Sequence, residues 1–378
     1  MDKLVEFLKD NKDFFMNFPR KSSYTANEVA KLREKYPDAP VNEILSQILL
    51  QNKMTNRVEH PNKMIFTPKA AEQATVWQIA KYHAEKLRNF TEIADLCCGI
   101  GADLIYLAKG KTKIYAVDSD KTTLNYAKVN SQMAENIVFS NGKAEEFNKS
   151  VQAIYIDPDR RYKGKRELNP DNYSPSLNQI YSLFKITKNI MIKLSPAMDY
   201  RKISLPIECS LEFVSCCGEL KEILLCFGKL ANKHHKKVII VDKNVVLYSV
   251  ADDVDEEGDL SNYIIEPDPA VIKAGMIGTL AHKLGGKILR DVRTLITLNN
   301  PIKTGFGKTY KLVWVDKLKN LNSYLKKNNV GNLVLKTRGF PIKVEEYRKK
   351  LKLKGKRKAI ILIIQQNGKF VFCKLGII

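Results

Sequence analysis

An apolar run that ends in a glycine turn is the feature that most constrains the fold of this chain. Residues 93–101 read Ile-Ala-Asp-Leu-Cys-Cys-Gly-Ile-Gly, and a second apolar run ends in Asp118, nineteen residues after Gly99. Glycine at positions 99 and 101 permits a sharp turn and lets a ligand approach the backbone. An acidic residue that ends the next strand can accept hydrogen bonds from both hydroxyls of a ribose. The spacing predicts a nucleoside-binding crevice at one edge of a sheet.

The residues around the two glycines favour one kind of nucleoside. A dinucleotide fingerprint has a third small residue three positions after the second glycine, where helix and strand pack over a pyrophosphate. Leu104 occupies that position and disfavours a pyrophosphate ligand. The pattern Asp95-x-x-x-Gly99-x-Gly101 instead resembles the first motif of class I S-adenosylmethionine-dependent methyltransferases.

This resemblance implies roles for individual residues. Asp95 is expected near the methionine moiety of S-adenosylmethionine, the glycines beside the cofactor, and Asp118 at its ribose. Methyltransferases often place an acid before an alanine to bind the adenine ring. Here Lys143 replaces that acid, so adenine contacts are expected from the main chain, from Glu145 or from Asn141. The expected cofactor-binding set is Asp95, Cys97, Gly99, Gly101, Asp118, Ser119, Ala144 and Glu145.

Strand-like and helix-like segments alternate from residue 91 to about residue 230. This alternation predicts a parallel sheet with right-handed crossovers. The last two strands are joined only by the short turn Cys217-Gly218, which predicts a terminal antiparallel hairpin. The resemblance likewise implies an α/β, Rossmann-like, seven-stranded sheet that ends in such a hairpin. The predicted strands are 92–98, 113–118, 137–140, 153–157, 189–194, 210–216 and 219–227.

Three domains are predicted: a helical region over 1–90, the cofactor-binding domain over 91–232 and a basic α+β domain over 233–378. Thr67-Pro68 predicts a helix start, and the helix is expected to run to about Arg88. The segment from Phe66 to Lys69, with Gln73 a turn later, resembles the lid of cap guanine-N2 methyltransferases. Without that resemblance, an apolar helix there is more often plain sheet packing.

The last domain carries most of the positive charge. Residues 301–378 contain 20 Lys and Arg against 3 Asp and Glu, within a formal net charge of +22 for the 378 residues. Such a segment attracts polyanions, so nucleic acid is the leading predicted partner and an anionic membrane surface the competitor. Lysine used merely for solubility would be spread more evenly along the chain.

Two motifs of this domain resemble a THUMP-like domain that accompanies a methyltransferase core in a prokaryotic family. The first is Ile-Glu-Pro-Asp-Pro-Ala at 265–270 with Ala-Gly at 274–275. The second is Arg-Gly-Phe-Pro at 338–341, followed by Leu-Lys-Leu-Lys-Gly at 351–355. By analogy with true THUMP domains of RNA-modifying enzymes, the resemblance implies binding of RNA, either transfer or ribosomal RNA.

The predicted catalytic motif ends the fourth strand. Asp157-Pro158-Asp159-Arg160 stands where base-directed amino methyltransferases have Asp/Asn-Pro-Pro-aromatic. The resemblance implies that Asp157 and the Pro158 carbonyl accept hydrogen bonds from an exocyclic amine. Asp159 and Arg160 depart from the pattern, so Arg160 is expected to hold a phosphate or to lie on a base. The alternative is a strand-ending turn with solvated arginines.

Three further residues are predicted to contact the substrate. Tyr162 offers a stacking ring, and Arg161 has the same choices as Arg160. Ser195 follows the fifth strand and either lines the opposite wall of the crevice or caps a helix.

Cysteine and hydropathy patterns bound the remaining possibilities. The seven cysteines are odd in number and lack any C-x-x-C spacing, so neither a disulfide framework nor a metal site is predicted. No secretion signal or membrane-length apolar run is found, which predicts a soluble, cytoplasmic protein without a membrane partner.

The leading hypothesis is an RNA methyltransferase. The alternatives are a small-molecule or protein methyltransferase and a non-catalytic RNA-binding protein on a methyltransferase fold.

Overall fold

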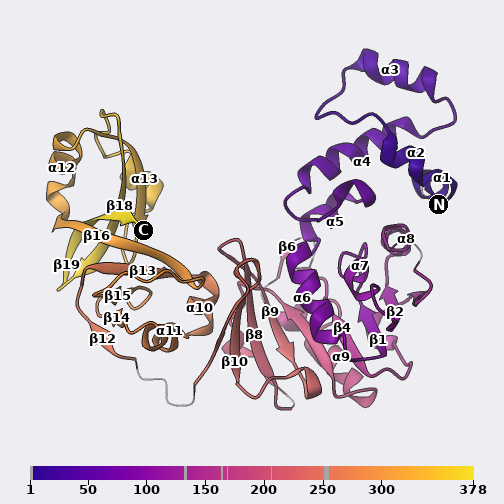
Figure 1. The fold of residues 1–378 in the computed structure, drawn as a ribbon. Coiled ribbons are helices and arrows are strands. Elements are labelled where there is room, and N and C mark those ends of the chain that lie inside the picture. The colour runs from indigo at the N-terminus through magenta and orange to yellow at the C-terminus, as the bar shows by residue number, and fades with distance from the viewer. Residues whose placement is uncertain (1–2, 132–133, 163–164, 168, 206, 251–254) are drawn as a thin grey trace. The chain divides into compact units, whose positions relative to one another are not determined.

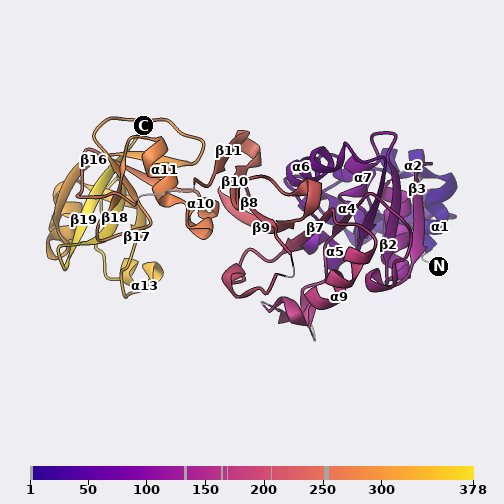
Figure 2. The ribbon, with the colours of Figure 1, turned by 90° about the horizontal axis from the view of Figure 1, so that it is seen from below.

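The computed structural model describes residues 3–131, 134–162, 165–167, 169–205, 207–250 and 255–378. Figure 1 labels the elements along the chain, and Figure 2 gives a second view turned by 90°. The chain divides into two compact units, residues 1–212 with 222–233 and residues 213–221 with 234–378. Among the described residues, no helix has the length and apolar character needed to cross a membrane.

The first unit begins with helices, as the apolar periodicity predicts. Their buried faces form one core that includes Leu4, Ile44, Ile48 and Phe66. The helices are α1 (Lys3–Asp10), α2 (Lys12–Asn17), α3 (Ala26–Lys35), α4 (Val41–Lys53), α5 (Pro68–Gln73) and α6 (Trp77–Leu87), with a 3₁₀ turn at Pro61–Lys63.

The single helix predicted over 68–88 is wrong, because the chain forms two helices there. The predicted start is confirmed: the Thr67 hydroxyl accepts a hydrogen bond from the Ala70 amide at 3.0 Å. Ala74 and Val76 then adopt extended backbone angles and separate α5 from α6. The β-branched pair Thr75-Val76 loses side-chain freedom in a helix, which favours a break at this point.

The sheet of the methyltransferase type has the predicted strands. They are β1 (Glu92–Leu96), β2 (Lys113–Asp118), β3 (Ile137–Asn141), β4 (Ala153–Ile156), β7 (Ile190–Leu194), β8 (Ser210–Cys216) and β9 (Glu219–Cys226). Strands β1, β2, β3, β4 and β7 pair in parallel, and β9 runs antiparallel to β7.

The strand order places a ligand crevice at one point of this sheet. The order is β11-β10-β8-β9-β7-β4-β1-β2-β3, so the chain moves outward from β1 to β3 and then returns to the other side of β1 as β4. Ligands bind at such a switch point, beyond the carboxyl ends of the strands. Two strands beyond the predicted seven lengthen the sheet, β10 (Lys236–Ile240) and β11 (Val245–Tyr248).

Three helices follow strands of this sheet, namely α7 (Leu104–Leu107), α8 (Lys121–Asn130) and α9 (Leu177–Tyr181). The Asp120 side chain caps α8 by accepting the Thr123 amide hydrogen at 2.9 Å.

The second unit contains an eight-stranded sheet in the order β12-β14-β15-β13-β16-β19-β18-β17. Its strands are β12 (Glu257–Gly258), β13 (Tyr263–Pro267), β14 (Lys287–Leu289), β15 (Ile296–Leu298), β16 (Gly307–Lys317), β17 (Val330–Thr337), β18 (Arg357–Gln366) and β19 (Lys369–Ile377). Its helices are α10 (Pro269–Ala274), α11 (Ile277–Lys283), α12 (Leu321–Lys327) and α13 (Val344–Arg348).

The residue pattern over 269–284 predicts one helix, but the structure has two, because Gly275 ends α10 in a left-handed conformation with φ of 69°. The strand β19 was not predicted. Its hairpin with β18 turns at Asn367-Gly368, both at positive φ, and Asn-Gly is the sequence signal for such a turn.

The two THUMP-like motifs meet in the fold. Glu266 of β13 accepts a hydrogen bond from Lys336 Nζ at 2.6 Å and another from the Arg338 guanidinium. Burial raises the pKa of Glu266, but Lys336 and then Arg338 outweigh burial and lower that pKa overall. This ion cluster ties the start of α10 to the end of β17.

Candidate active site

The glycine turn after β1 is built from residues at positive φ. Cys97, Gly99 and Gly101 have φ of 63°, 58° and 81°. A Cβ added at Gly101 would lie 3.3 Å from Ala127 of α8, so only glycine lets the turn pack against that helix. Cys97 has a Cβ atom, and residues with a Cβ atom rarely adopt a positive φ. The backbone therefore leaves the strand abruptly and opens the crevice.

Asp118 ends β2 and faces this turn. Its Oδ2 accepts the Gly99 amide hydrogen and its Oδ1 the Asp120 amide hydrogen, both at 2.9 Å. Burial raises the pKa of Asp118, and these two hydrogen bonds oppose the rise. Each carboxylate oxygen has a further lone pair, so the group can still accept from two hydroxyls of a ligand. The Asn141 side chain instead donates to the main-chain oxygens of Asp118 and Ser119, at 2.8 and 3.0 Å.

Asp95 presents an unusual buried carboxyl group. Its side chain is 1% exposed, and within the described residues its Oδ2 has no hydrogen-bond partner. Burial raises the pKa of Asp95 well above its usual range, and the nearby Asp103, Asp157 and Asp118 raise it further. A buried acceptor without a partner costs free energy. A cationic ligand with a hydrogen-bond donor would supply a partner for Oδ2 and favour the ionised form of Asp95.

These groups line one cavity of about 800 Å³. Helix α5 supplies part of the wall through Thr67, Lys69 and Gln73, where the sequence predicted a lid. Ten of the predicted site residues lie in the lining, namely Asp95, Cys97, Gly99, Asp118, Ser119, Ala144, Glu145, Asp157, Pro158 and Arg160. Two predicted residues whose side chains or backbone the structure describes are outside it, namely Gly101 and Ser195.

All four residues of the Asp-Pro-Asp-Arg motif line the cavity. Asp157 Oδ2 accepts a hydrogen bond from Lys193 Nζ at 2.7 Å, and Pro158 is buried. Asp159, which replaces a proline of the related motif, pairs with Lys69 Nζ of α5 at 2.9 Å. Arg160 lies in the lining. The second acid thus connects the motif to the wall formed by α5.

For two of the remaining predicted substrate residues the structure describes the backbone alone. Arg161 and Tyr162 form the short strand β5 (Arg161–Tyr162), paired with β6 (Lys165–Arg166), and their side chains are outside what the structure describes. The Ser195 hydroxyl accepts the Ala197 amide hydrogen at 3.3 Å. That bond closes a local turn and is not the helix cap of the alternative interpretation, because the next helical turn begins at Tyr200 and is capped by Asp199.

Several polar residues of the site were not predicted from the sequence. Lys193 and Glu222 are buried in strands β7 and β9, and His83 is fully buried on α6. Burial lowers the pKa of His83, but Glu222 and Asp103 outweigh it and raise that pKa to about 10. Lys193 and Glu222 are charged residues inside otherwise apolar strands. That pattern indicates a buried charge with a partner, because charged residues are rarely buried alone.

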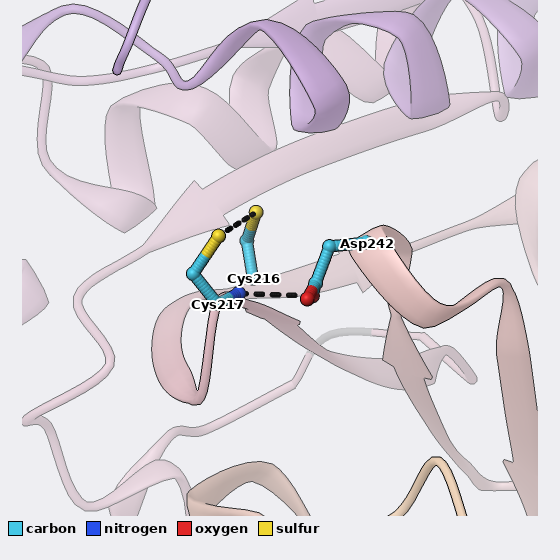
Figure 3. A group of neighbouring side chains, drawn as sticks. All are labelled: Cys216, Cys217 and Asp242. Atoms are coloured by element: carbon cyan, nitrogen blue, oxygen red, sulfur yellow. Dashed lines mark hydrogen bonds between the residues drawn. The ribbon is translucent and has the colours of Figure 1, made fainter.

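A second pair of adjacent cysteines, Cys216 and Cys217, belongs to the second unit (Figure 3). Cys216 Sγ and Cys217 Sγ are 3.7 Å apart, and Asp242 Oδ1 accepts the Cys217 amide hydrogen at 2.9 Å. Asp242 Oδ2 lies 3.7 Å from Lys243 Nζ. Burial raises the pKa of Cys216 to about 12, which keeps the thiol protonated. Both oxygens of the carboxylate have partners, so we assign this group no ligand.

Comparisons with known proteins agree with this geometry. Residues 314–373 match the family model described as "THUMP domain-like". Uncharacterised S-adenosylmethionine-dependent methyltransferases of two Mycobacterium tuberculosis strains are each 24% identical over 311 residues, which cover 80% of this chain and 85% of theirs. A crystal structure of a candidate methyltransferase from Porphyromonas gingivalis superposes with a TM-score of 0.71 and 20% identity, covering 94% of this chain and 99% of that one. The fold is therefore shared over nearly the whole chain.

Proposed function

We propose that this protein, which is a class I S-adenosylmethionine-dependent methyltransferase with a C-terminal THUMP-like domain, methylates a base of RNA. The observation that carries the proposal is one cavity of the first unit. It joins the glycine turn and Asp118 on one side to the Asp157-Pro158 motif on the other.

The residues of the cavity fit S-adenosylmethionine. Asp118 has acceptor capacity for the two ribose hydroxyls, and the turn at Gly99 leaves the backbone open beside it. Asp95 has an unpartnered buried oxygen for a cationic part of the methionine moiety. Ala144 and Glu145 line the region proposed for the adenine ring. When bound, this cofactor supplies a methyl group on a sulfonium, which is already a strong methyl donor.

The proposed acceptor is an exocyclic amino group. A carboxylate at Asp157 and the main-chain oxygen of Pro158 accept hydrogen bonds, and an amine on a base can donate two. Such a pair of acceptors fixes the direction of the nitrogen lone pair, and orientation alone accounts for large accelerations. Arg160 in the lining offers a cation for a phosphate or a flat surface for a base.

The proposed RNA surface is the basic segment, residues 343–358. This segment has nine Lys and Arg and two Asp and Glu, and it lies within the THUMP-like region. Lys349, Lys350, Lys352 and Lys354 are exposed. Lysines that neutralise phosphates release condensed counterions, which makes binding strong at low salt and weak at high salt. Transfer and ribosomal RNA are the proposed substrates, and the cytoplasm is the proposed compartment.

Binding measurements separate the proposal from its alternatives. The full chain is titrated with S-adenosylmethionine by calorimetry and with a transfer RNA pool by fluorescence anisotropy between 50 and 200 mM salt. An RNA methyltransferase binds both, and RNA affinity falls steeply with salt. Cofactor binding without RNA affinity favours a small-molecule or protein substrate. RNA binding without cofactor binding favours a non-catalytic protein, and both of these results contradict the proposal.

A charge-matched pair of variants tests the surface. The first replaces four exposed lysines of the basic segment by glutamate, at Lys349, Lys350, Lys352 and Lys354. The control makes the same change in net charge at exposed lysines of the first unit, at Lys31, Lys53, Lys63 and Lys111. The first variant is expected to lose RNA affinity and to flatten its salt dependence. Equal losses in the two variants would show that only total charge matters.

A further inference from the structure

A chain of alternating charges lies beneath the cavity, inside the first unit. Lys193 Nζ is 2.7 Å from Asp157 Oδ2 and 3.8 Å from Glu222 Oε2. Glu222 Oε1 is 2.6 Å from His83 Nε2, and His83 Nδ1 is 2.7 Å from Asp103 Oδ1. Each of the two cations therefore stands between two carboxylates.

Burial shows how this chain is connected to the cavity. The side chains of His83 and Glu222 are 0% and 1% exposed, and that of Lys193 is 6% exposed. The side chain of Asp157 is 27% exposed and lies in the cavity lining. Both ends of the chain, Asp157 and Asp103, therefore line the cavity, and its middle members lie in the protein interior.

Lys193 holds that carboxylate through one oxygen. Its ammonium group donates to Asp157 Oδ2 and, at 2.9 Å, to Thr75 Oγ1. Within the described residues, the hydrogen bond and the ion pair of Asp157 both engage Oδ2. A carboxylate with one oxygen fixed has its plane fixed, and its other oxygen then points in a set direction. Oδ1 is the oxygen left to accept a hydrogen from an acceptor amine.

We propose that Lys193 is a positioning residue for methyl transfer, which orients Asp157 so that its Oδ1 accepts a hydrogen bond from the amine of the substrate. Glu222 and His83 in turn hold Lys193 in place. This inference rests on the proposed function, because it presupposes that Asp157 meets the acceptor amine. It predicts that the loss of Lys193 acts on the chemical step and leaves cofactor binding intact.

The test compares Lys193→Met with a matched variant, Lys86→Met. Lys86 is a largely buried lysine with a side chain 12% exposed, 2.8 Å from Glu212 Oε1 and 3.0 Å from the Leu230 carbonyl oxygen, and neither of these partners lines the cavity. Both variants remove one largely buried cation of the first unit. A loss of activity that comes from general destabilisation would therefore affect both.

Activity is followed as tritium transferred from S-adenosylmethionine to RNA of a strain that lacks the gene. Lys193→Met is expected to lower kcat about 100-fold, the cost of a slightly misplaced group, with KM for RNA and cofactor affinity unchanged. Lys193→Arg is expected to restore most of kcat, and Lys86→Met to leave kcat unchanged. Should Lys193→Met not fold, Lys193→Leu likewise removes the hydrogen-bond donor and has the same expected result. Unchanged kcat, or an equal loss in Lys86→Met, would overturn the proposal.

A crystal structure of the Lys193 variant supplies a readout that needs no substrate. The Asp157 carboxylate is expected to rotate away from its wild-type orientation. If the wild type methylates no RNA but Asp157 rotates, the proposed function fails while Lys193 is shown to orient Asp157. If Asp157 keeps its orientation, the positioning role is wrong whatever the wild type methylates.

Discussion

Replacement of Asp118 by asparagine tests the cofactor site most sharply. The carboxylate accepts two backbone amide hydrogens at 2.9 Å, from Gly99 and Asp120, and has capacity for two ribose hydroxyls. An asparagine keeps the size but has one accepting oxygen instead of two. Hydrogen bonds to a charged group contribute about 1.5–3 kcal/mol each. Loss of one such bond lowers the affinity for S-adenosylmethionine about 10- to 150-fold.

Asp120→Asn is the control for this variant. Asp120 lines the same cavity and caps α8, and asparagine caps helices equally well. Both variants remove one negative charge from the cavity, but only Asp118→Asn removes a proposed ribose acceptor. Calorimetry with S-adenosylmethionine and with its demethylated product measures both affinities. Wild-type affinity in Asp118→Asn, or equal losses in the two variants, would refute the assignment of Asp118.

Two further changes follow from the same geometry. Gly101→Ala places a side chain at φ of 81° and 3.3 Å from Ala127, so the free energy of unfolding should fall by about 1–2 kcal/mol in denaturant titrations. Gly142→Ala is the control, because a Cβ at that position meets open space, and its free energy of unfolding should be unchanged. The pKa of His83 is raised from 6.5 to about 10, so its protonated ring contributes stability that is complete below pH 6.5 and is lost as pH rises towards 10. In thermal unfolding the wild type should lose stability over that interval and His83→Gln should lose less; parallel curves would contradict this.

Local signals in the sequence were sufficient to predict most of the first unit. Apolar runs that alternate with helical segments predicted all seven strands of the methyltransferase sheet. Ten of the predicted site residues meet in one cavity because parallel strands end at the same edge. The break between α5 and α6 was not predicted, because the low helix propensity of Thr75-Val76 is a weak signal on its own.

Long-range contacts explain what could not be predicted. Lys193, Glu222 and His83 are far apart in sequence, and only the packing of α6 against the sheet brings their charges together. The same holds for Asp159, whose departure from the related motif gains a partner in Lys69. The strand β19 was not predicted, although Asn367-Gly368 is the sequence signal for its hairpin.

The most direct test of the central claim is the nucleoside content of RNA in cells. The gene is deleted, and modified nucleosides of transfer and ribosomal RNA are compared by mass spectrometry, with complementation by the wild type and by Asp157→Ala. The account predicts that one methylated base disappears on deletion, returns with the wild type and stays absent with Asp157→Ala. An unchanged profile in every RNA class, or full recovery with Asp157→Ala, would contradict it.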